Sequence, residues 1–376
     1  MNIGFEAKRV FHNKTGLGNY SRDLIRLLSQ YSPENNYFLY NPKFSDVKLF
    51  EANNINVFEK KPSSFFYSKF YNFWRQRGVT EDLVKDKINI FHGLSGEIPR
   101  GLRAKNIKSV VTIHDLIFVK YPHLYSFFDR KIHFYKFKKA AQQADLVLAI
   151  SEQTKKDIVE FLKIDASKIK VIYQGCHAVF KKDFSDDEYK EVITKFNLPK
   201  QFILNVGTIE TRKNILLAVK AVKNIDTCLV IVGKETAYTN EIKNYISEHH
   251  LENKVIFLKG LSLQELAILY KLAKVFVYPS LYEGFGIPII EALYSKTPVI
   301  TTRGGVFAEA GGPNSVYVNP TSVNEMEKAL KTLLQNDALR KEIEEKGFEY
   351  VQRFNDEDIS KQIINSYLNL ISCPKH

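Results

Sequence analysis

Short apolar runs alternate along the chain with longer amphipathic stretches, from the first residues to about residue 335. Apolar runs of four to six residues between turn signals are typical of buried strands, and a spacing of 3.6 residues is typical of helices. Their repeated alternation predicts an α/β protein with parallel sheets. In the first half we expect strands at residues 2–5, 37–40, 88–91, 109–113, 146–150 and 170–173, and helices at 19–30 and 152–163.

A second series begins at Phe202. Further strands are expected at residues 228–232, 254–258, 275–278, 298–301 and 315–318, and helices at 214–224, 239–249, 262–272, 287–295, 323–334 and 356–372. The charged stretch 181–192 interrupts the pattern and is interpreted as a linker. A chain of 376 residues is long enough for two domains, which we place at residues 1–180 and 181–356.

Composition narrows the class of protein. Hydrophobic residues make up 44% of the chain and aromatic residues 13%, which is typical of a globular protein. Cys176, Cys228 and Cys373 are odd in number and widely spaced, so they indicate neither a disulfide framework nor a zinc site. No apolar run approaches the ~20 residues that span a bilayer, and the first residues indicate a strand and not a signal peptide. We therefore expect a cytoplasmic protein without a bound metal.

The net charge of +12 is unevenly distributed. Residues 1–180 carry 29 Lys and Arg against 17 Asp and Glu, whereas residues 181–376 carry 25 of each. The whole excess therefore lies in the first half, which indicates that this half meets an anionic partner.

Residues 275–293 predict a strand, a glycine loop and a helix. Gly284 and Gly286 allow backbone conformations that other residues avoid, and Pro288 suits the first turn of a helix. The free N–H groups and the positive end of that helix would then face the carboxyl end of the strand, where an anion binds well.

Glu283 and Glu291 flank this anion site, eight positions apart. An anion site with a hydrogen-bond acceptor on each side suits a ligand that carries both phosphate and hydroxyl groups, such as a sugar nucleotide. The simpler alternative is that a glutamate near a helix start only interacts favourably with the helix dipole.

The segment resembles the Glu-x7-Glu motif of the retaining glycosyltransferases of family 4. The resemblance implies the GT-B fold, in which two Rossmann-like domains face each other across a cleft and a C-terminal helix, here residues 357–376, crosses back to the first domain. It also implies that Glu283 contacts hydroxyls of the donor sugar, that Glu291 holds the ribose, and that the backbone around Phe285 and Gly286 touches the sugar.

Arg212 and Lys213 follow the first strand of the second series, after Gly207, and precede a helix. Two cations in a loop are usually solvated, but cations at a helix start are unfavourable unless an anion is present. The resemblance implies that they neutralise the diphosphate leaving group without a metal. Main-chain contacts at Gly207 and Leu261 are expected to hold the donor.

Gly16 and Gly18 form a Gly-x-Gly loop before the first helix. A dinucleotide fingerprint would need a third glycine where Ser21 stands, which argues against a dehydrogenase. The resemblance implies instead that this loop faces the donor phosphates.

His114 stands at the carboxyl end of a strand, where open α/β sheets bind ligands. It is either a structural histidine bonded to Asp115 or, as the resemblance implies, a residue near the donor sugar. Asp115 is expected to orient His114 or its loop, and His92 to line the acceptor side.

Two stretches, residues 60–77 and 121–139, interleave aromatic and basic residues. Such stretches suit an anionic lipid surface or single-stranded nucleic acid, or they form amphipathic helices whose aromatics enter the core. Because the charge belongs to the domain expected to bind the acceptor, we favour a lipid-linked acceptor at a membrane over a nucleic acid.

The sequence thus predicts a retaining, metal-independent glycosyltransferase of surface polysaccharide synthesis. It would take a hexose, with mannose favoured, from a GDP- or UDP-sugar to a glycan or lipid-linked acceptor at the inner face of the membrane. A sugar-nucleotide epimerase of the same fold and a non-enzymatic nucleic-acid-binding protein are the alternatives.

Overall fold

The computed structural model describes residues 1–44, 49–51 and 54–372. The chain divides into two compact units: unit 1 comprises Met1–Gln174 and Asn355–His376, and unit 2 comprises Gly175–Phe354. The boundaries expected after residues 180 and 356 lie a few residues away from these. We describe each unit by itself.

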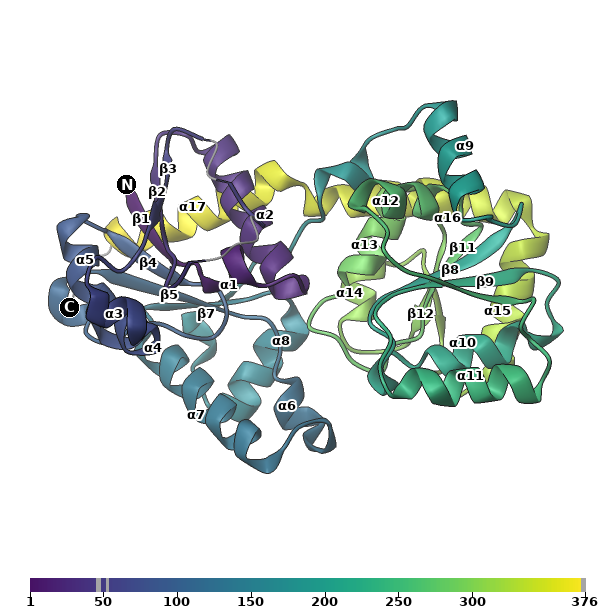
Figure 1. Ribbon diagram of the computed structural model, residues 1–376, viewed down its shortest axis with the longest axis horizontal. Coiled ribbons are helices and arrows are strands. Elements are labelled where there is room, and N and C mark those ends of the chain that lie inside the picture. Colours follow the sequence, from purple (N-terminus) through teal and green to yellow (C-terminus); the bar gives the residue numbers. More distant parts are fainter. Residues whose placement is uncertain (45–48, 52–53, 373–376) are drawn as a thin grey trace. The chain divides into compact units, whose positions relative to one another are not determined.

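Unit 1 contains a seven-stranded parallel sheet in the order β3-β2-β1-β4-β5-β6-β7 (Figure 1). Its strands are β1 (Asn2–Glu6), β2 (Asn36–Tyr40), β3 (Val57–Lys60), β4 (Ile90–Gly93), β5 (Lys108–Ile113), β6 (Leu146–Ala149) and β7 (Ile169–Val171). The six strands predicted for this half are confirmed. The pattern missed β3 because this edge strand buries only one of its four residues, Val57, and so lacks an apolar run.

The helices of unit 1 are short, except for three of about four turns. They are α1 (Lys8–His12), α2 (Gly16–Tyr31), α3 (Phe65–Lys69), α4 (Tyr71–Phe73), α5 (Val79–Lys85), α6 (Ile117–Lys120), α7 (Phe127–Gln143), α8 (Glu152–Asp157) and α17 (Asp356–Ser372). Two π-helical turns, η1 (Trp74–Gly78) and η4 (Ile158–Leu162), continue α4 and α8.

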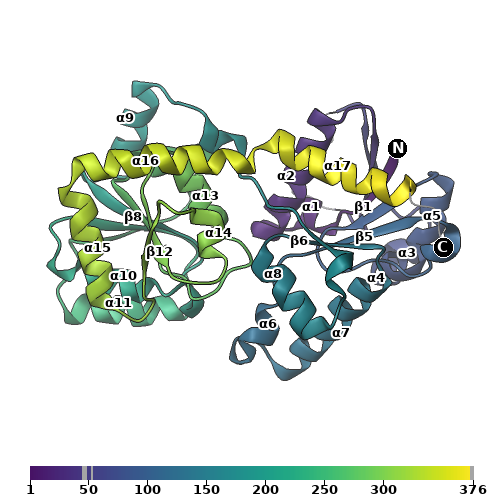
Figure 2. The ribbon, with the colours of Figure 1, turned by 180° about the vertical axis from the view of Figure 1, so that it is seen from behind.

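The C-terminal helix α17 packs against α2, as expected for a helix that returns to the first unit (Figure 2). Arg26 on α2 pairs with Asp356 at 2.8 Å. On the other end of the helix, the Tyr367 hydroxyl shares a hydrogen bond of 2.6 Å with His92 Nδ1 on β4. Residues 373–376, with Cys373, lie outside the described residues.

Unit 2 contains a six-stranded parallel sheet in the order β10-β9-β8-β11-β12-β13. The strands are β8 (Phe202–Val206), β9 (Cys228–Val232), β10 (Val255–Leu258), β11 (Val275–Tyr278), β12 (Val299–Thr302) and β13 (Val316–Val318). Every strand predicted for this half is confirmed. The strands are largely buried, because helices cover both faces of the sheet; Figure 1 shows α10 and α11 on one side and α12 and α13 on the other.

The helices of unit 2 connect these strands and extend beyond them. They are α9 (Asp186–Lys195), α10 (Ile215–Ala221), α11 (Tyr238–Glu248), α12 (Leu263–Leu272), α13 (Ile287–Tyr294), α14 (Phe307–Gly311), α15 (Val323–Gln335) and α16 (Asp337–Val351).

The interpretation of residues 181–192 as a linker was wrong. Residues from Asp186 onward form α9, which belongs to unit 2. A capping box between Ser185 and Glu188 starts this helix, and the acidic residues of its first turn interact favourably with the helix dipole. The charges that suggested a linker are therefore a helix start signal.

Within residues 1–44, 49–51 and 54–372, no helix combines the length and the apolar character needed to cross a membrane.

Candidate functional site

The order of strands in unit 2 reverses between β8 and β11, which are hydrogen-bonded neighbours. Open α/β sheets bind ligands at the carboxyl ends of the strands at such a switch point. The loop after β8 carries Arg212 and Lys213, and the loop after β11 carries Glu283. The fold therefore brings together the two segments singled out from the sequence.

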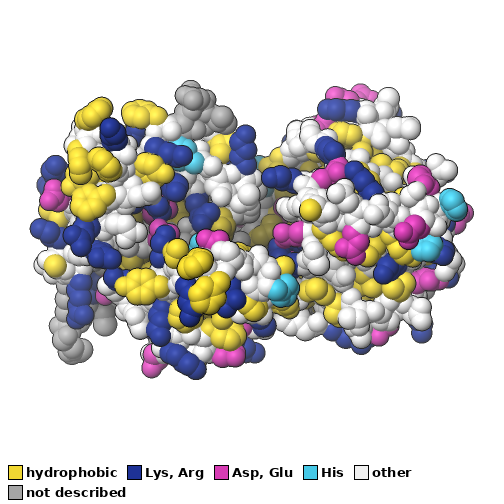
Figure 3. Space-filling model, turned by 60° about the horizontal axis from the view of Figure 1, so that its bottom comes forward, with side chains coloured by type: hydrophobic (Ala, Val, Ile, Leu, Met, Phe, Trp, Pro, Cys, Tyr) yellow, Lys and Arg dark blue, Asp and Glu magenta, His cyan; other side chains and the backbone are white. Residues whose placement is uncertain are grey.

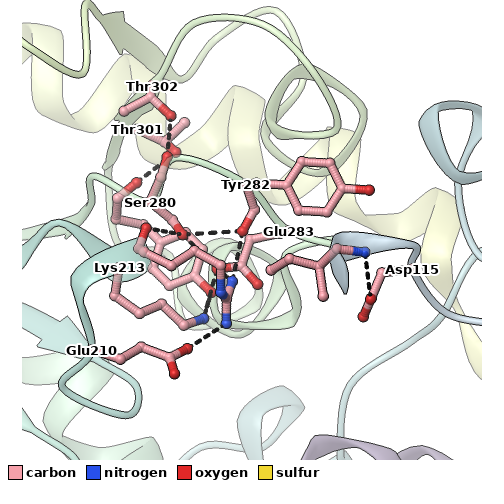
Figure 4. A network of polar contacts seen from close by, with 11 residues as sticks. Asp115, Glu210, Lys213, Ser280, Tyr282, Glu283, Thr301 and Thr302 are labelled. Atoms are coloured by element: carbon pink, nitrogen blue, oxygen red, sulfur yellow. Dashed lines mark hydrogen bonds and ion pairs between the residues drawn. The ribbon is translucent and has the colours of Figure 1, made fainter. Parts of the chain in front are cut away.

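Hydrogen bonds hold these two loops against each other. The Leu281 N–H donates to the Arg212 carbonyl at 2.9 Å. Asn214, in the left-handed region with a φ of 53°, donates its side-chain N–H to the Pro279 carbonyl at 3.2 Å. The Thr302 hydroxyl, at the end of β12, donates to the Ser280 carbonyl at 2.7 Å (Figure 4). The loops are thus fixed before a ligand arrives.

One carboxylate oxygen, Glu283 Oε1, is the centre of the site (Figure 4). Lys213 Nζ lies 2.6 Å from it, a guanidinium nitrogen of Arg212 2.7 Å, and the Ser280 hydroxyl 2.6 Å. Lys213 also donates to the Tyr278 hydroxyl at 2.6 Å, and Arg212 also pairs with Glu210 at 2.5 Å.

The electrostatics of the cluster favour the charged forms of Glu283 and Arg212. Burial would raise the pKa of Glu283, but Lys213 and Arg212 outweigh burial and lower it to about 2. Burial lowers the pKa of Lys213, and Glu283 offsets this only in part. Burial would also lower the pKa of Arg212, but Glu283 and Glu210 raise it above its usual value. Such a buried set of charges is stable only as long as each has its partners.

The two cations are therefore neither solvated nor without an anion. The alternative of solvated cations is thus wrong, because Glu283 from another loop is their counter-ion. Binding of a diphosphate by Arg212 and Lys213 stays a prediction. The contact joins residues about 70 positions apart, so only the order of the strands could have indicated it. In the described part of the chain, no group of three or more His, Cys, Asp or Glu side chains is placed to hold a metal ion.

The glycine loop before α13 has the backbone that the sequence indicated. Gly286 precedes the first residue of α13 with a φ of 122°, which other residues rarely adopt. The Phe285 ring is buried and packs edge-on against Phe354, so this residue can offer only its main chain to a ligand. Glu291, in the second turn of α13, accepts a hydrogen bond from the Tyr270 hydroxyl at 2.9 Å.

Gly207 lies where the loops after β8 and β9 nearly touch. A Cβ on Gly233 would come within 1.8 Å of the Gly207 carbonyl oxygen, so this close approach requires a glycine there. Gly207 itself has a φ of 147° and lies beside the Lys213 side chain. Leu261 is half-buried and follows Gly260, in the turn between β10 and α12.

The Gly-x-Gly loop of unit 1 begins α2. A Cβ on Gly18 would lie 1.9 Å from the Asn13 carbonyl oxygen, so packing within the loop already requires this glycine. Gly16 is exposed at the first position of the helix, and a Cβ added there would have no atom within 4 Å, so packing does not require a glycine at this position. A contact of either residue with a donor stays a prediction.

His114 follows β5 and is buried. Its Nδ1 accepts a hydrogen bond from the Gln174 side chain at 3.3 Å, so Nε2 carries the proton and donates to the Leu94 carbonyl at 2.8 Å. Burial lowers the pKa of His114 to about 4, and the ring is therefore neutral at neutral pH. Asp115 does not orient this ring through those nitrogens; it accepts the Ile117 N–H at 3.1 Å at the start of α6, and so shapes the loop.

The expectation that His92 lines the acceptor side was wrong. Its side chain is fully buried, and its two ring nitrogens bond to the hydroxyls of Tyr367 and Thr112 at 2.6 and 2.8 Å. Burial lowers the pKa of His92 to about 3, so it stays neutral. It ties α17 to the sheet and has no surface for a ligand.

Sequence reasoning missed an ion cluster at the switch point of unit 1, between β1 and β4. Arg75 pairs with Glu6, the last residue of β1, at 2.8 Å, and with Glu97, just after β4, at 3.2 Å. Lys136 on α7 reaches Glu97 at 3.3 Å. None of these residues belongs to a recognisable motif, and only the strand order would have pointed to them.

Known proteins place the chain in a family. Residues 15–178 match "Glycosyltransferase Family 4", and residues 186–350 match "Glycosyl transferases group 1". The chain is 34% identical to the O-antigen chain mannosyltransferase RfbU of Salmonella typhimurium over 262 residues, which cover 69% of this chain and 68% of the relative. The chain belongs to glycosyltransferase family 4. It is a retaining glycosyltransferase of the GT-B fold.

Other similar proteins cover almost the whole of this glycosyltransferase. The O-antigen chain mannosyltransferase B of Escherichia coli is 24% identical over 98% of this chain and 99% of its own length. Sucrose-phosphate synthase from Thermosynechococcus elongatus has a similar structure, with a TM-score of 0.80 at 22% identity over 99% of both chains. A second similar structure, Anabaena Alr3699/HepE in complex with UDP-glucose, has a TM-score of 0.76 at 18% identity over 98% of this chain and 100% of that one. At these identities the structures support the fold alone.

The low pKa of Glu283 predicts a particular dependence of stability on pH. Its folded-state pKa of about 2 lies below the ordinary value of 4.5, so its contribution to stability is complete above about pH 5 and is lost as the pH falls towards 2. Glu283→Gln should therefore lower the thermal midpoint most at neutral pH, and the difference from the wild type should shrink between about pH 5 and pH 2.

The matched control is Glu342→Gln, an exposed glutamate on α16 whose change should have little effect at any pH. Thermal unfolding in a series of buffers measures both variants. If the difference in thermal midpoint between Glu283→Gln and the wild type stayed constant from neutral pH down to about pH 2, this would contradict the charged state assigned to Glu283.

Proposed function

We propose that this glycosyltransferase moves a hexose, with mannose favoured, from a nucleotide-diphosphate sugar to a glycan or lipid-linked acceptor in surface polysaccharide synthesis. The observation that carries the proposal is the cluster of Glu283, Arg212 and Lys213 at the switch point of unit 2. The names of the relatives, O-antigen mannosyltransferases, support the choice of sugar and of pathway. We propose GDP-mannose as the first donor to test and UDP-sugars as the second.

The donor diphosphate would bind beside Arg212 and Lys213. An ammonium group has three N–H donors and a guanidinium has five, so contacts with Glu283 leave donors for phosphate oxygens. Arg212 and Lys213 are held in place by Glu283, so they lose little freedom when the diphosphate binds. The start of α13, with Gly286 and the main chain of Phe285, adds the positive end of a helix.

The sugar and the nucleoside would bind on either side of that diphosphate. Glu283 would accept a hydrogen bond from a sugar hydroxyl, and Glu291, which Tyr270 orients, would hold the ribose. Main-chain groups at Gly207 and Leu261 would complete the pocket on unit 2, and Gly16 and Gly18 of unit 1 would face the donor phosphates. The roles of Glu283, Glu291, Gly16 and Gly18 follow the family resemblance.

In the proposed reaction, the bond between the anomeric carbon and the diphosphate oxygen breaks, and a bond to the acceptor oxygen forms on the same face. The acceptor's proton passes to the leaving diphosphate. Arg212 and Lys213 stabilise the negative charge that develops on the diphosphate, because fixed charges in a site without bulk water act strongly. His114 is neutral and its two ring nitrogens already bond to Gln174 and the Leu94 carbonyl, so it would shape the site near the sugar and would not act as an acid.

The acceptor would bind to unit 1. Its switch point carries the cluster of Glu6, Arg75 and Glu97, whose carboxylates suit sugar hydroxyls and whose cation suits the phosphate of a lipid-linked sugar. A lipid-linked acceptor lies in a membrane, and we propose that the enzyme works in the cytoplasm at the inner face of that membrane.

Substitutions in the cluster of Glu283, Arg212 and Lys213 should reduce the rate of sugar transfer. We expect Glu283→Ala, and separately the double variant Arg212→Ala/Lys213→Ala, to lower kcat by about 100-fold, because each removes a fixed charge contact from the transition state. Lys346→Ala, on the exposed side of α16, is the control and should leave kcat unchanged.

Product release from GDP-mannose, or from the UDP-sugar that proves to be the donor, measures the rate with a lipid-linked acceptor. Near-normal turnover by Glu283→Ala or by Arg212→Ala/Lys213→Ala would refute the assignment of these residues to the donor site. Conversion of the donor sugar to its epimer without an acceptor would identify an epimerase, and salt-sensitive binding of single-stranded RNA without transfer would identify a nucleic-acid-binding protein.

Transfer should continue in the presence of EDTA. Arg212 and Lys213 already supply the positive charge that a metal ion supplies to a diphosphate in other enzymes. The measurement is the transfer rate with EDTA, and with Mg²⁺ or Mn²⁺ added back. Loss of activity on chelation, with recovery on adding the metal, would show that the diphosphate is neutralised in a different way.

A further inference from the structure

The first of the two aromatic-basic stretches exposes its aromatic rings. On α3, Phe65 is 84% exposed and Phe66 54%, and Phe70 and Phe73, which follow, are exposed as well. Trp74 is the exception, because it is buried in the core and donates its indole N–H to Asp82 at 2.7 Å. The segment is thus anchored by Trp74 and turns its phenylalanines to the solvent.

The second aromatic-basic stretch also exposes aromatic rings, at the start of α7. Phe127 and Phe128 are 60% and 76% exposed, and Ile132 and Tyr135, one and two turns later, are exposed too. The buried residues of this helix are Ala140 and Ala141 near its end. The alternative that both stretches send most of their aromatics into the core is therefore wrong. Single exposed apolar residues are ordinary, but groups of this kind mark a surface that meets another molecule.

The two stretches border the same loop, after β4. Glu97 in that loop pairs with Arg75 of η1, which continues the first stretch, and with Lys136 of α7. The loop lies tightly against α7, since a Cβ on Gly96 would come within 2.5 Å of the Phe137 ring. Figure 3 shows hydrophobic side chains interleaved with Lys and Arg on the part of this face formed by unit 1. We call the exposed side chains of α3, α4 and α7 the aromatic-basic surface.

The charges of this surface are positive with one exception, Asp129. Residues 60–80 contain no Asp or Glu, and residues 116–144 contain only Asp129. Asp129 is held at the start of α7, where it accepts a hydrogen bond from the Ser126 hydroxyl at 2.7 Å. Lys69 and Lys131 are exposed beside the phenylalanines, and Lys131 lies over the Phe127 ring at 5.5 Å. Rings that can enter a lipid interface are thus flanked by cations that attract anionic headgroups.

We propose that the aromatic-basic surface of unit 1 docks on an anionic lipid bilayer, with the rings of α3 and α7 in the headgroup region. An anionic bilayer fits better than single-stranded nucleic acid, because the surface also exposes Ile132, an aliphatic side chain that can enter lipid but offers no flat ring on which a base could stack. Docking would bring the cluster of Glu6, Arg75 and Glu97 close to the lipid. Arg75 lies in η1, which directly follows α4 in the chain, and Glu97 contacts Lys136 on α7, so both adjoin the aromatic-basic surface.

This inference extends the proposed function, since it supplies the surface from which a lipid-linked acceptor would enter. Its test contains neither donor nor acceptor, so a failure to bind lipid and a failure to transfer sugar are separate results.

The experiment is co-sedimentation of the full chain with vesicles of phosphatidylcholine, with and without phosphatidylglycerol. Binding should require phosphatidylglycerol and should weaken as salt rises above physiological strength. Phe127→Ser/Phe128→Ser should weaken binding by at least ~10-fold, because the rings no longer enter the interface. Lys69→Glu/Lys131→Glu should weaken it by a similar factor, because two attractive charges become repulsive.

The controls carry equivalent changes on the exposed surface of unit 2. Ile193→Ser/Leu263→Ser and Lys190→Glu/Lys346→Glu should bind vesicles as the wild type does. All substituted side chains are exposed, and thermal unfolding checks that each variant folds.

Equal binding to both kinds of vesicle, or equal loss in the variants and their controls, would overturn the proposal. Self-association that disappears in Phe127→Ser/Phe128→Ser without any binding to vesicles would also overturn it and would make the surface a contact between copies of this chain. Tighter binding to single-stranded RNA than to vesicles would also overturn the proposal and would make the aromatic-basic surface a nucleic-acid-binding surface.

Discussion

The buried contact between Glu283 and the cations Lys213 and Arg212 is the constraint on which the site of unit 2 depends. Two positive side chains at the start of a helix repel each other and oppose the helix dipole, and the carboxylate of Glu283, from the loop after β11, offsets both effects. The same contact joins the loops after β8 and β11, which the strand order makes neighbours. The contact therefore links the fold to the site, and the charges that would receive a diphosphate are in place in advance.

Unit 1 repeats this arrangement with different residues. At its switch point, Arg75 lies between Glu6 and Glu97, and the order of strands reverses there as it does in unit 2. In each unit an ion cluster stands where an α/β sheet binds ligands. Each cluster joins two cations to two carboxylates: Arg212 and Lys213 to Glu210 and Glu283 in unit 2, and Arg75 and Lys136 to Glu6 and Glu97 in unit 1. Their neighbours differ. The cluster of unit 2 lies beside the glycine loop before α13, which fits the proposed donor, whereas the cluster of unit 1 contacts α7 and its aromatic-basic surface, which fits the proposed lipid-linked acceptor.

Local patterns predicted most of the sheet, because buried parallel strands appear as continuous apolar runs. They also predicted the glycine loop before α13, where Gly286 has the positive φ that its sequence context requires. They failed elsewhere, for three different reasons. The charges of α9 looked like a linker, although Ser185 and Glu188 cap a helix. The pairing of Glu283 with Lys213 was missed because it depends on strand order. The exposure of Phe65 and Phe128 was undecided, because periodicity shows that a helix has two faces and not which face meets the core.

The most direct test of the central claim is a comparison of nucleoside diphosphate and nucleoside monophosphate binding by isothermal titration calorimetry. If Arg212 and Lys213 bind the second phosphate, the wild type should bind the diphosphate more tightly than the monophosphate, and Arg212→Ala/Lys213→Ala should bind both with similar, weak affinity. A double variant that keeps the full preference of the wild type for the diphosphate would contradict the account.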